Sequence, residues 1–191
     1  MPDLSLDPKS TALILIDLQM GIASRTTAPH TAPSVIANAV RLAEKCRKVG
    51  STVVLVRVSF AADGSDRLTM PTDAQFPAPA ATSDWAEIVP ELGPKPGDLV
   101  VTKRQWGAFY GTDLDLHLRR RGVKTIILGG ISTNFGVEST ARDAYERAYA
   151  LVLVEDAMAA LGAEAHAFAI ANIFPRLGLV RSTAEALKSL G

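Results

Sequence analysis

Short apolar runs alternate with stretches of helical periodicity along most of the chain. Five runs rich in Val, Ile and Leu are typical of strands buried on both faces: residues 11–17, 51–58, 99–102, 125–129 and 150–154. Four stretches repeat apolar residues at helical spacing: residues 33–49, 112–122, 136–149 and 163–174. A late strand at 177–181 and a short terminal helix complete the pattern. The alternation predicts parallel strands joined by right-handed crossovers, and therefore a three-layer α/β sandwich.

The segment 59–98 breaks this alternation. It contains six prolines and seven acidic residues but only two basic ones, and it exceeds the usual length of a loop. Segments of this size inside a compact domain usually act as lids or interface arms. We therefore expect one domain over residues 1–191, with a lid or interface loop at 59–98.

The charge balance excludes some classes of partner. Twenty basic residues match twenty acidic ones, so no net field favours nucleic acid or a membrane surface. The single cysteine, Cys46, excludes an internal disulfide and falls on the apolar face of a predicted helix. The N-terminus is polar, and no apolar run reaches the roughly 18 residues of a membrane span. These features predict a cytoplasmic protein that binds neither nucleic acid nor membrane.

Three features fall at the carboxyl ends of predicted strands. Asp17 ends the first strand, Lys103 follows the third, and the turn at 129–136 follows the fourth. In open parallel sheets this edge carries the binding site. A carboxylate and an ammonium beside the N–H groups of a turn make a proton-transfer pair next to an anion hole. Each feature alone also suits a structural role, as a turn cap, a solvated lysine or a plain connection, but together they favour a site.

Three motifs in order carry a family resemblance: Leu-Ile-Asp-Leu-Gln-Met-Gly at 15–21, Lys-Arg-Gln-Trp-Gly-Ala-Phe-Tyr-Gly-Thr-Asp-Leu at 103–114, and Gly-Ile-Ser-Thr-Asn-Phe-Gly-Val-Glu-Ser-Thr-Ala-Arg-Asp-Ala at 130–144. Over nearly its whole length the chain resembles the isochorismatase-like, or cysteine hydrolase, family. The resemblance implies a six-stranded, mostly parallel sheet flanked by helices and an Asp–Lys–Cys triad. Asp17 matches the family acid and Lys103 the family lysine, whereas Gly136 falls on the position of the cysteine.

The resemblance also implies features of the backbone and of the assembly. A non-proline cis peptide is expected near Ile131–Ser132, which would turn the N–H groups of Ser132 and Gly136 toward one spot. A homo-oligomer, either a dimer or a tetramer, is expected as well.

The glycine at position 136 decides which chemistry is expected. Amidases of this family need a thiolate for acyl transfer, and Gly136 cannot supply one. The hydroxyl of Ser139 lies three residues further on, but no histidine is placed to activate it. The isochorismatases also lack the cysteine; an acid protonates the enol-ether carbon and water attacks the oxocarbenium ion. That reaction needs a proton donor with a raised pKa, so Asp17 is the predicted acid and Lys103 orients it.

The substrate is less constrained by the sequence. The expected pocket residues, chosen for their places beside the motifs, are Gln19, Trp106, Phe109, Tyr110 and Thr133. The aromatic members equally suit helix–sheet or subunit packing. Isochorismate carries two carboxylates, and the obvious cations near the predicted site are few: Arg57, Arg67 and Arg104. Another hydrolysable small molecule is therefore expected as readily as isochorismate.

No metal and no other cofactor is expected. His30, His117 and His166 are widely separated along the chain, and the Asp-x-His pattern of zinc-carrying nicotinamidases is missing after Arg57. Asp156 suits a turn or helix cap better than a catalytic role. Two alternatives to the acid-catalysed hydrolase stay open. One is a binding or interaction protein on a retired hydrolase scaffold, and the other is acyl transfer by direct attack of water.

Overall fold

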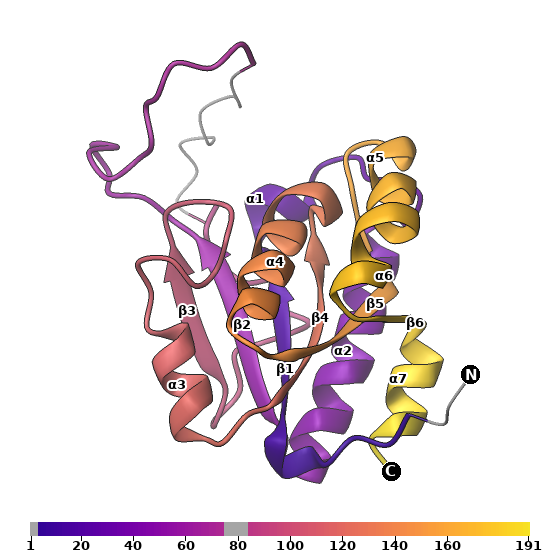
Figure 1. Ribbon diagram of the computed structural model, residues 1–191. Coiled ribbons are helices and arrows are strands. Elements are labelled where there is room, and N and C mark those ends of the chain that lie inside the picture. Colours follow the sequence, from indigo (N-terminus) through magenta and orange to yellow (C-terminus); the bar gives the residue numbers. More distant parts are fainter. Residues whose placement is uncertain (1–3, 75–83) are drawn as a thin grey trace.

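A computed structural model describes residues 4–74 and 84–191 and arranges them in three layers, with helices on both faces of one sheet (Figure 1). The six strands have the spatial order β3-β2-β1-β4-β5-β6, and every neighbouring pair is parallel. In chain order they are β1 (Thr11–Ile16), β2 (Thr52–Val58), β3 (Leu99–Lys103), β4 (Thr125–Ile131), β5 (Ala150–Ala159) and β6 (Leu179–Arg181). The predicted six-stranded α/β sandwich is therefore confirmed, with a sheet that is parallel throughout.

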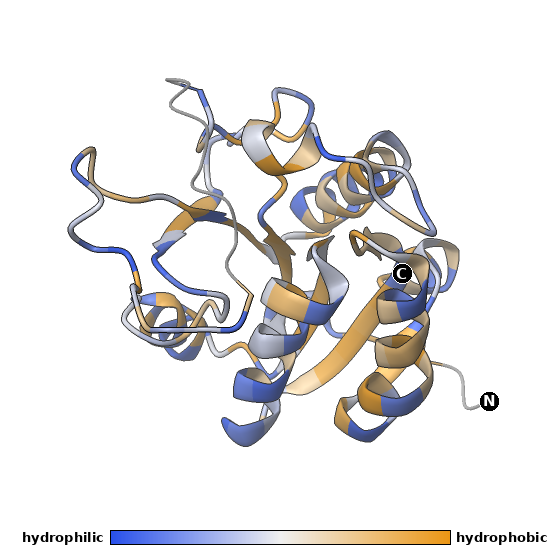
Figure 2. Ribbon diagram, turned by 90° about the horizontal axis from the view of Figure 1, so that it is seen from above, coloured by the Kyte–Doolittle hydropathy of each residue, from blue (hydrophilic) through white to orange (hydrophobic). Residues whose placement is uncertain are grey.

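Helices from different parts of the chain cover the two faces. On one face, α2 (Ala32–Val49) and α7 (Thr183–Ser189) pack on one set of strand side chains. The other face carries α3 (Leu114–Arg120), α4 (Glu138–Glu146) and α6 (Phe174–Leu177). Figure 2 shows apolar colour on the strands and on the helix sides that face them, with polar colour outward.

The central strand β1 explains why its sequence is continuously apolar. Leu13 and Leu15 point into the core with α2, while Ile14 and Ile16 point into the core on the opposite face. All six residues of β1 are buried. A strand with helices on both sides has no wet face, so the period-two pattern of a half-exposed strand is absent.

The helices and strands near the carboxyl edge differ in detail from the prediction. β4 runs on to Ile131 and β5 to Ala159, with a register shift between them at Leu128 and Gly130. The helix predicted to begin at 136 is preceded by a π-helical turn, η2 (Thr133–Val137). The helix predicted at 163–174 is divided into α5 (Ala163–Phe168), a π-helical turn η3 (Ala169–Ile173) and α6.

The two described parts of segment 59–98 lie in different places relative to the sheet. Residues 61–74 project away from the sheet (Figure 1) and expose Leu68 and Met70. Residues 84–92 instead run beside the exit of β1, where Met20 N–H donates to the carbonyl of Glu87 and Val89 N–H to that of Leu18. Because Met20 is the first residue of the short helix α1 (Met20–Ala23), these bonds also attach α1 to residues 84–92. The expectations for residues 75–83 lie outside the described part of the chain.

We expect Gly130→Ala to destabilise the fold severely. Gly130 has a φ of 130°, and a Cβ atom there would lie 2.1 Å from the carbonyl oxygen of Ile16. Backbone strain and the clash of β4 with β1 should together lower the free energy of unfolding by more than about 3 kcal/mol. Urea denaturation of the variant measures this loss. Gly162→Ala is the control because a Cβ atom there meets nothing within 4 Å; equal stabilities of the two variants would contradict the prediction.

Candidate functional site

A buried ion pair crosses the carboxyl edge of the sheet. Asp17 directly follows β1, and Lys103 is the last residue of β3, so the lysine reaches across the end of β2. Lys103 Nζ donates to Asp17 Oδ2 at 2.7 Å and to the carbonyl oxygen of Gln105 at 3.0 Å. Asp17 is 5% exposed and Lys103 only 2%. The structure therefore brings together the two charged residues that the sequence placed at separate strand ends.

The Asp17 backbone sets the direction of its carboxylate. Its N–H donates to the carbonyl oxygen of Val56 on β2 at 2.8 Å. Its φ is 54°, in the left-handed region, which aspartate tolerates better than most residues with a side chain. The chain thus turns sharply as it leaves β1 and points the carboxylate toward β3.

The two carboxylate oxygens of Asp17 have different surroundings. Oδ2 accepts the bond from Lys103, whereas Oδ1 is buried and has no hydrogen-bond partner among the described residues. Burial raises the pKa of Asp17 to about 6, although the charge of Lys103 and its hydrogen bond oppose the rise. Asp17 can therefore carry or release a proton near neutral pH, with Oδ2 held by Lys103 and Oδ1 without a partner among the described residues.

The turn after β4 lies directly against this carboxylate. Gly136 is buried in η2, and a Cβ atom on it would be 3.0 Å from Asp17 Oδ2 and 2.9 Å from Ile16 Cγ2. The peptide bond between Ile131 and Ser132 is cis, as the resemblance implied. All three parts of the predicted site (Asp17, Lys103 and the turn) are therefore adjacent.

Hydrogen bonds tie this turn to the segment that follows β3. Thr140 Oγ1 donates to the carbonyl oxygen of Gly136 at 2.7 Å and accepts from Ala108 N–H at 3.2 Å. Trp106 packs on Phe135, with ring centroids 5.0 Å apart. The loop that begins at Lys103 and the turn at Gly136 consequently form one connected wall.

Comparison with known proteins shows the family of this chain. The model of the isochorismatase domain matches residues 11–185. The chain belongs to the isochorismatase family.

Its relatives cover the chain from end to end. The isochorismatase family protein YecD of Escherichia coli O157:H7 is 50% identical over 98% of this chain and 100% of its own length. A solved structure of an isochorismatase family protein from Burkholderia thailandensis matches with a TM-score of 0.94 and 44% identity, over 98% of each chain. The ureidoacrylate amidohydrolase RutB of Methylobacterium radiotolerans is 34% identical over 98% of this chain and 82% of its own. These comparisons confirm the prediction of an isochorismatase-like hydrolase. They do not identify its substrate.

The expected pocket residues of this family member are placed in different ways. Trp106 is half-exposed, and its carbonyl oxygen lies 3.5 Å from the Cβ position of Gly136. Tyr110 is 76% exposed. Phe109 differs from the expectation, because it is buried and stacks on Tyr149 in the core behind the sheet, with ring centroids 6.0 Å apart.

Gln19 is a positioning residue in this structure. It is fully buried; its Oε1 accepts from Val58 N–H at 2.9 Å, and its Nε2 donates to the carbonyl oxygens of Val58 and Trp85 at 3.0 and 3.1 Å. The side-chain amide therefore holds residue 85 against the end of β2 instead of lining a pocket.

The three arginines considered above as partners for a dianionic substrate each contact another protein group. Arg57 Nε donates to Thr102 Oγ1 at 3.2 Å, and Arg67 lies 5.3 Å from the ring centroid of Phe60. Arg104 forms an ion pair with Asp66.

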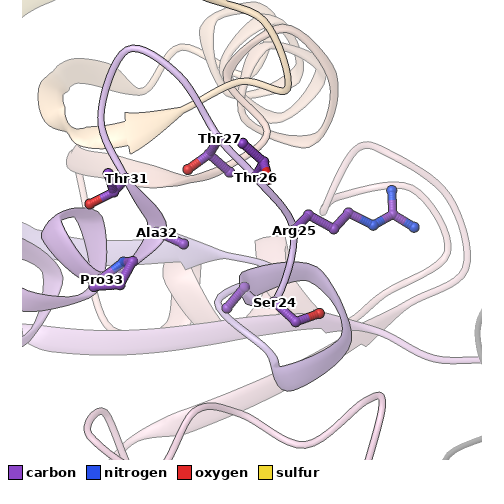
Figure 3. A pocket seen from close by; sticks show the side chains of 8 residues that line it. Ser24, Arg25, Thr26, Thr27, Thr31, Ala32 and Pro33 are labelled. Atoms are coloured by element: carbon purple, nitrogen blue, oxygen red, sulfur yellow. The ribbon is translucent and has the colours of Figure 1, made fainter.

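A cavity of about 310 Å³ lies at the connection between α1 and α2 (Figure 3). Its lining consists of residues 23–27 and 31–33, and Arg25 extends away from the other lining side chains. Asp17, Lys103 and Gly136 do not line it, so this hollow is separate from the ion pair.

Two other side chains have the structural roles expected of them. Cys46 is buried in the core, and burial raises the pKa of its thiol to about 12. Asp156 Oδ1 accepts from Thr183 N–H at 2.6 Å and from Thr183 Oγ1 at 2.7 Å, at the first turn of α7. Among residues 4–74 and 84–191, no helix has the length and apolar character needed to cross a membrane.

The three histidines were expected in separate surface or core positions, but two of them lie together. His30 and His166 lie beside each other and beside Glu155, whereas His117 lies apart and pairs with Asp113. A signal was present, because Glu155 directly follows a predicted strand and His166 lies on the next predicted helix, at the edge of the sheet that carries Asp17.

We expect Lys103→Met to destabilise the protein in a pH-dependent way. Removing the lysine leaves the Asp17 carboxylate buried without its counter-ion, which costs about 3–5 kcal/mol at pH 8. The folded-state pKa of Asp17, already raised, should rise further, so at pH 5 the carboxyl is protonated and the loss is smaller. Urea denaturation at both pH values measures the difference.

The double variant Asp17→Asn/Lys103→Met is the control for this prediction. It removes both charges and should recover much of the stability at pH 8. If Lys103→Met loses the same free energy of unfolding at pH 5 and at pH 8, the buried charge of Asp17 is not the cause of the loss.

Proposed function

We propose that this isochorismatase family member hydrolyses a small molecule with Asp17 as the proton donor and without a covalent nucleophile. The supporting observation is the asymmetry of the buried Asp17 carboxyl, whose pKa is raised to about 6 and whose Oδ1 has no partner among the described residues. Lys103 orients the group through Oδ2.

Vinyl-ether hydrolysis fits these groups. Asp17 gives its proton to the terminal carbon of the enol ether, and the C=C electron pair forms the new C–H bond. Water attacks the resulting oxocarbenium carbon and returns a proton to Asp17, and the hemiketal then divides into a ketone and an alcohol. Lys103 stabilises the carboxylate that exists between the two proton transfers. The N–H groups of Ser132 and Gly136, at the turn that begins at Ile131, are proposed to hold a substrate oxygen.

Amide hydrolysis through an acyl-enzyme fits the chain less well. The relative RutB is an amidohydrolase by name, but Gly136, which we align with the family cysteine, has no nucleophilic side chain. Cys46 is in the core and cannot replace it. Any amidase activity would therefore require direct attack by water.

The charge around the site bears on the choice of substrate. Arg57, Arg67 and Arg104 each contact a protein group, so a substrate with two carboxylates would compete with existing contacts, most directly with the ion pair of Arg104 and Asp66. We therefore propose a small enol ether or related ester as the substrate class, with isochorismate as the first compound to assay.

We expect Asp17→Asn to lower kcat/KM by about 10²–10⁴ in an assay of pyruvate release from isochorismate, or of whichever enol ether or ester is turned over. A proton donor must be protonated, so wild-type kcat/KM should fall about tenfold per pH unit above pH 6. Asp113→Asn, at an exposed acid, is the control and should keep the wild-type profile. Unchanged turnover in Asp17→Asn would remove the acid assignment.

Gly136→Ala should reduce activity at least tenfold while the protein stays folded. The added methyl group would press on Asp17 Oδ2 and on the Ile16 side chain, and so displace the acid from its substrate. Ser139→Ala, three residues further on in α4, is the matched control and should retain activity. If both variants match wild type, close packing at Gly136 does not matter for the reaction.

A binding protein on a hydrolase scaffold is the second candidate, favoured by the glycine at position 136. It predicts no turnover in a panel of enol ethers, esters and amides, with ligand binding that needs Asp17 and Lys103. Homo-oligomer formation and a cytoplasmic location also stay predictions; sedimentation that showed a monomer would contradict the former.

A further inference from the structure

Three side chains from distant parts of the chain converge beside the candidate active site. His30 lies between α1 and α2, Glu155 lies on β5, and His166 lies on α5. Their ligand atoms lie within 4.8 Å of one another, and within residues 4–74 and 84–191 this is the one group of three His, Cys, Asp or Glu side chains that converges in this way.

Backbone contacts hold this cluster in place. Ala28 and Ala160 exchange two hydrogen bonds of 2.8 and 3.0 Å, which fasten the His30 loop to the end of β5. Thr27 Oγ1 donates to the carbonyl oxygen of His30 at 2.9 Å. The loop therefore presents His30 to β5 in a defined position.

The buried imidazole of His166 has one nitrogen in use and one without a partner. Its Nδ1 contacts Thr133 Oγ1 at 2.9 Å, while its Nε2 is buried and has no hydrogen-bond partner among the described residues. Nε2 points toward Glu155 Oε1 at 3.6 Å, which is too long for a hydrogen bond. When Nδ1 carries the proton, two electron-pair donors face each other across this gap, and a cation between them would satisfy both.

We propose that His30, Glu155 and His166 bind a divalent transition-metal ion, and that Zn²⁺ is the ion that suits two imidazoles and one carboxylate best. The site is independent of the proposed function of Asp17. It also differs from the Asp-x-His position of zinc-carrying nicotinamidases, whose pattern is missing after Arg57.

The distances suit a small ion. Zinc–ligand bonds of about 2.0–2.2 Å place neighbouring ligand atoms of a tetrahedral site about 3.3 Å apart. Glu155 Oε1 lies 2.8 Å from His30 Nε2 and 3.6 Å from His166 Nε2. The rings of His30 and His166 are nearly perpendicular, with centroids 5.6 Å apart. Small rotations of His30 and Glu155, whose side chains are 28% and 35% exposed, would complete the geometry.

The outer contacts suit a metal ligand as well. A metal-binding histidine usually donates its second N–H to a neighbouring oxygen, which fixes the ring, and Thr133 Oγ1 supplies that oxygen for His166. Burial lowers the pKa of His166, with Glu155 opposing the shift, and the neutral imidazole is the form that binds metal. The partial exposure of His30 and Glu155 leaves an approach for the ion and for a water ligand.

The test is titration of the untagged, EDTA-treated and dialysed full chain with ZnCl₂ in a calorimeter. We expect one Zn²⁺ per chain in wild type, and at least tenfold weaker binding in His30→Ala and in Glu155→Gln. Thr133→Val should weaken binding about 10- to 100-fold through loss of the outer contact. Titration with Co²⁺ should produce visible d–d absorption of tetrahedral type in wild type that is lost in His30→Ala.

Two controls separate this site from other modes of binding. His117→Ala removes another histidine that pairs with a carboxylate, and it should bind Zn²⁺ like wild type. Asp17→Asn should also bind like wild type, whether or not it retains activity. Substoichiometric binding in wild type, or equal affinity in wild type, His30→Ala and Glu155→Gln, would overturn the proposal.

Discussion

The buried ion pair between Asp17 and Lys103 is the constraint on which the candidate site depends. Removing two charges from water costs several kcal/mol per ion, and their attraction repays this only when the remaining bonding positions are satisfied. Lys103 has two acceptors, but Asp17 keeps one oxygen without a partner among the described residues. Hydrophobic side chains would fill the same space with less risk to stability. An incompletely compensated pair at the carboxyl edge is therefore better explained by chemistry than by folding.

The ion pair also requires fixed registers between the strands that carry it. The lysine spans β2, so the registers of β1 with β2 and of β2 with β3 decide whether Nζ reaches the carboxylate. On the other side, Gly130 lets β4 approach Ile16 more closely than a Cβ atom permits, and Gly136 lets the following turn pack tightly against Asp17. Glycine at position 136 thus lets the backbone of the turn pack directly against the acid.

The sequence predicts best what depends on local pattern and on topology. Residues 11–17 are continuously apolar because β1 is central, and Asp17 and Lys103 were found because parallel strands end at one edge. The positions of the Phe109 and Gln19 side chains depend on the paths of loops. The spacing of apolar residues in the sequence does not predict these paths. Phe109 turns back into the core beside Tyr149, and the Gln19 amide is used by the backbone at residues 58 and 85. Side-chain direction after a strand end is a tertiary property, so position beside a motif does not determine where Phe109 and Gln19 point.

The grouping of His30, Glu155 and His166 also depends on side-chain directions that the sequence does not record. Their positions show a contact between two parts of the carboxyl edge of the sheet. Thr133 belongs to the π-helical turn that contains Gly136, and its hydroxyl contacts the buried ring of His166. Any group that fixes His166 therefore also restrains the turn that packs on Asp17. The contact is short and buried, and it joins two elements that follow the adjacent strands β4 and β5. The order of the strands thus places the histidine cluster next to the turn that packs on the acid, although the two sites share no side chain.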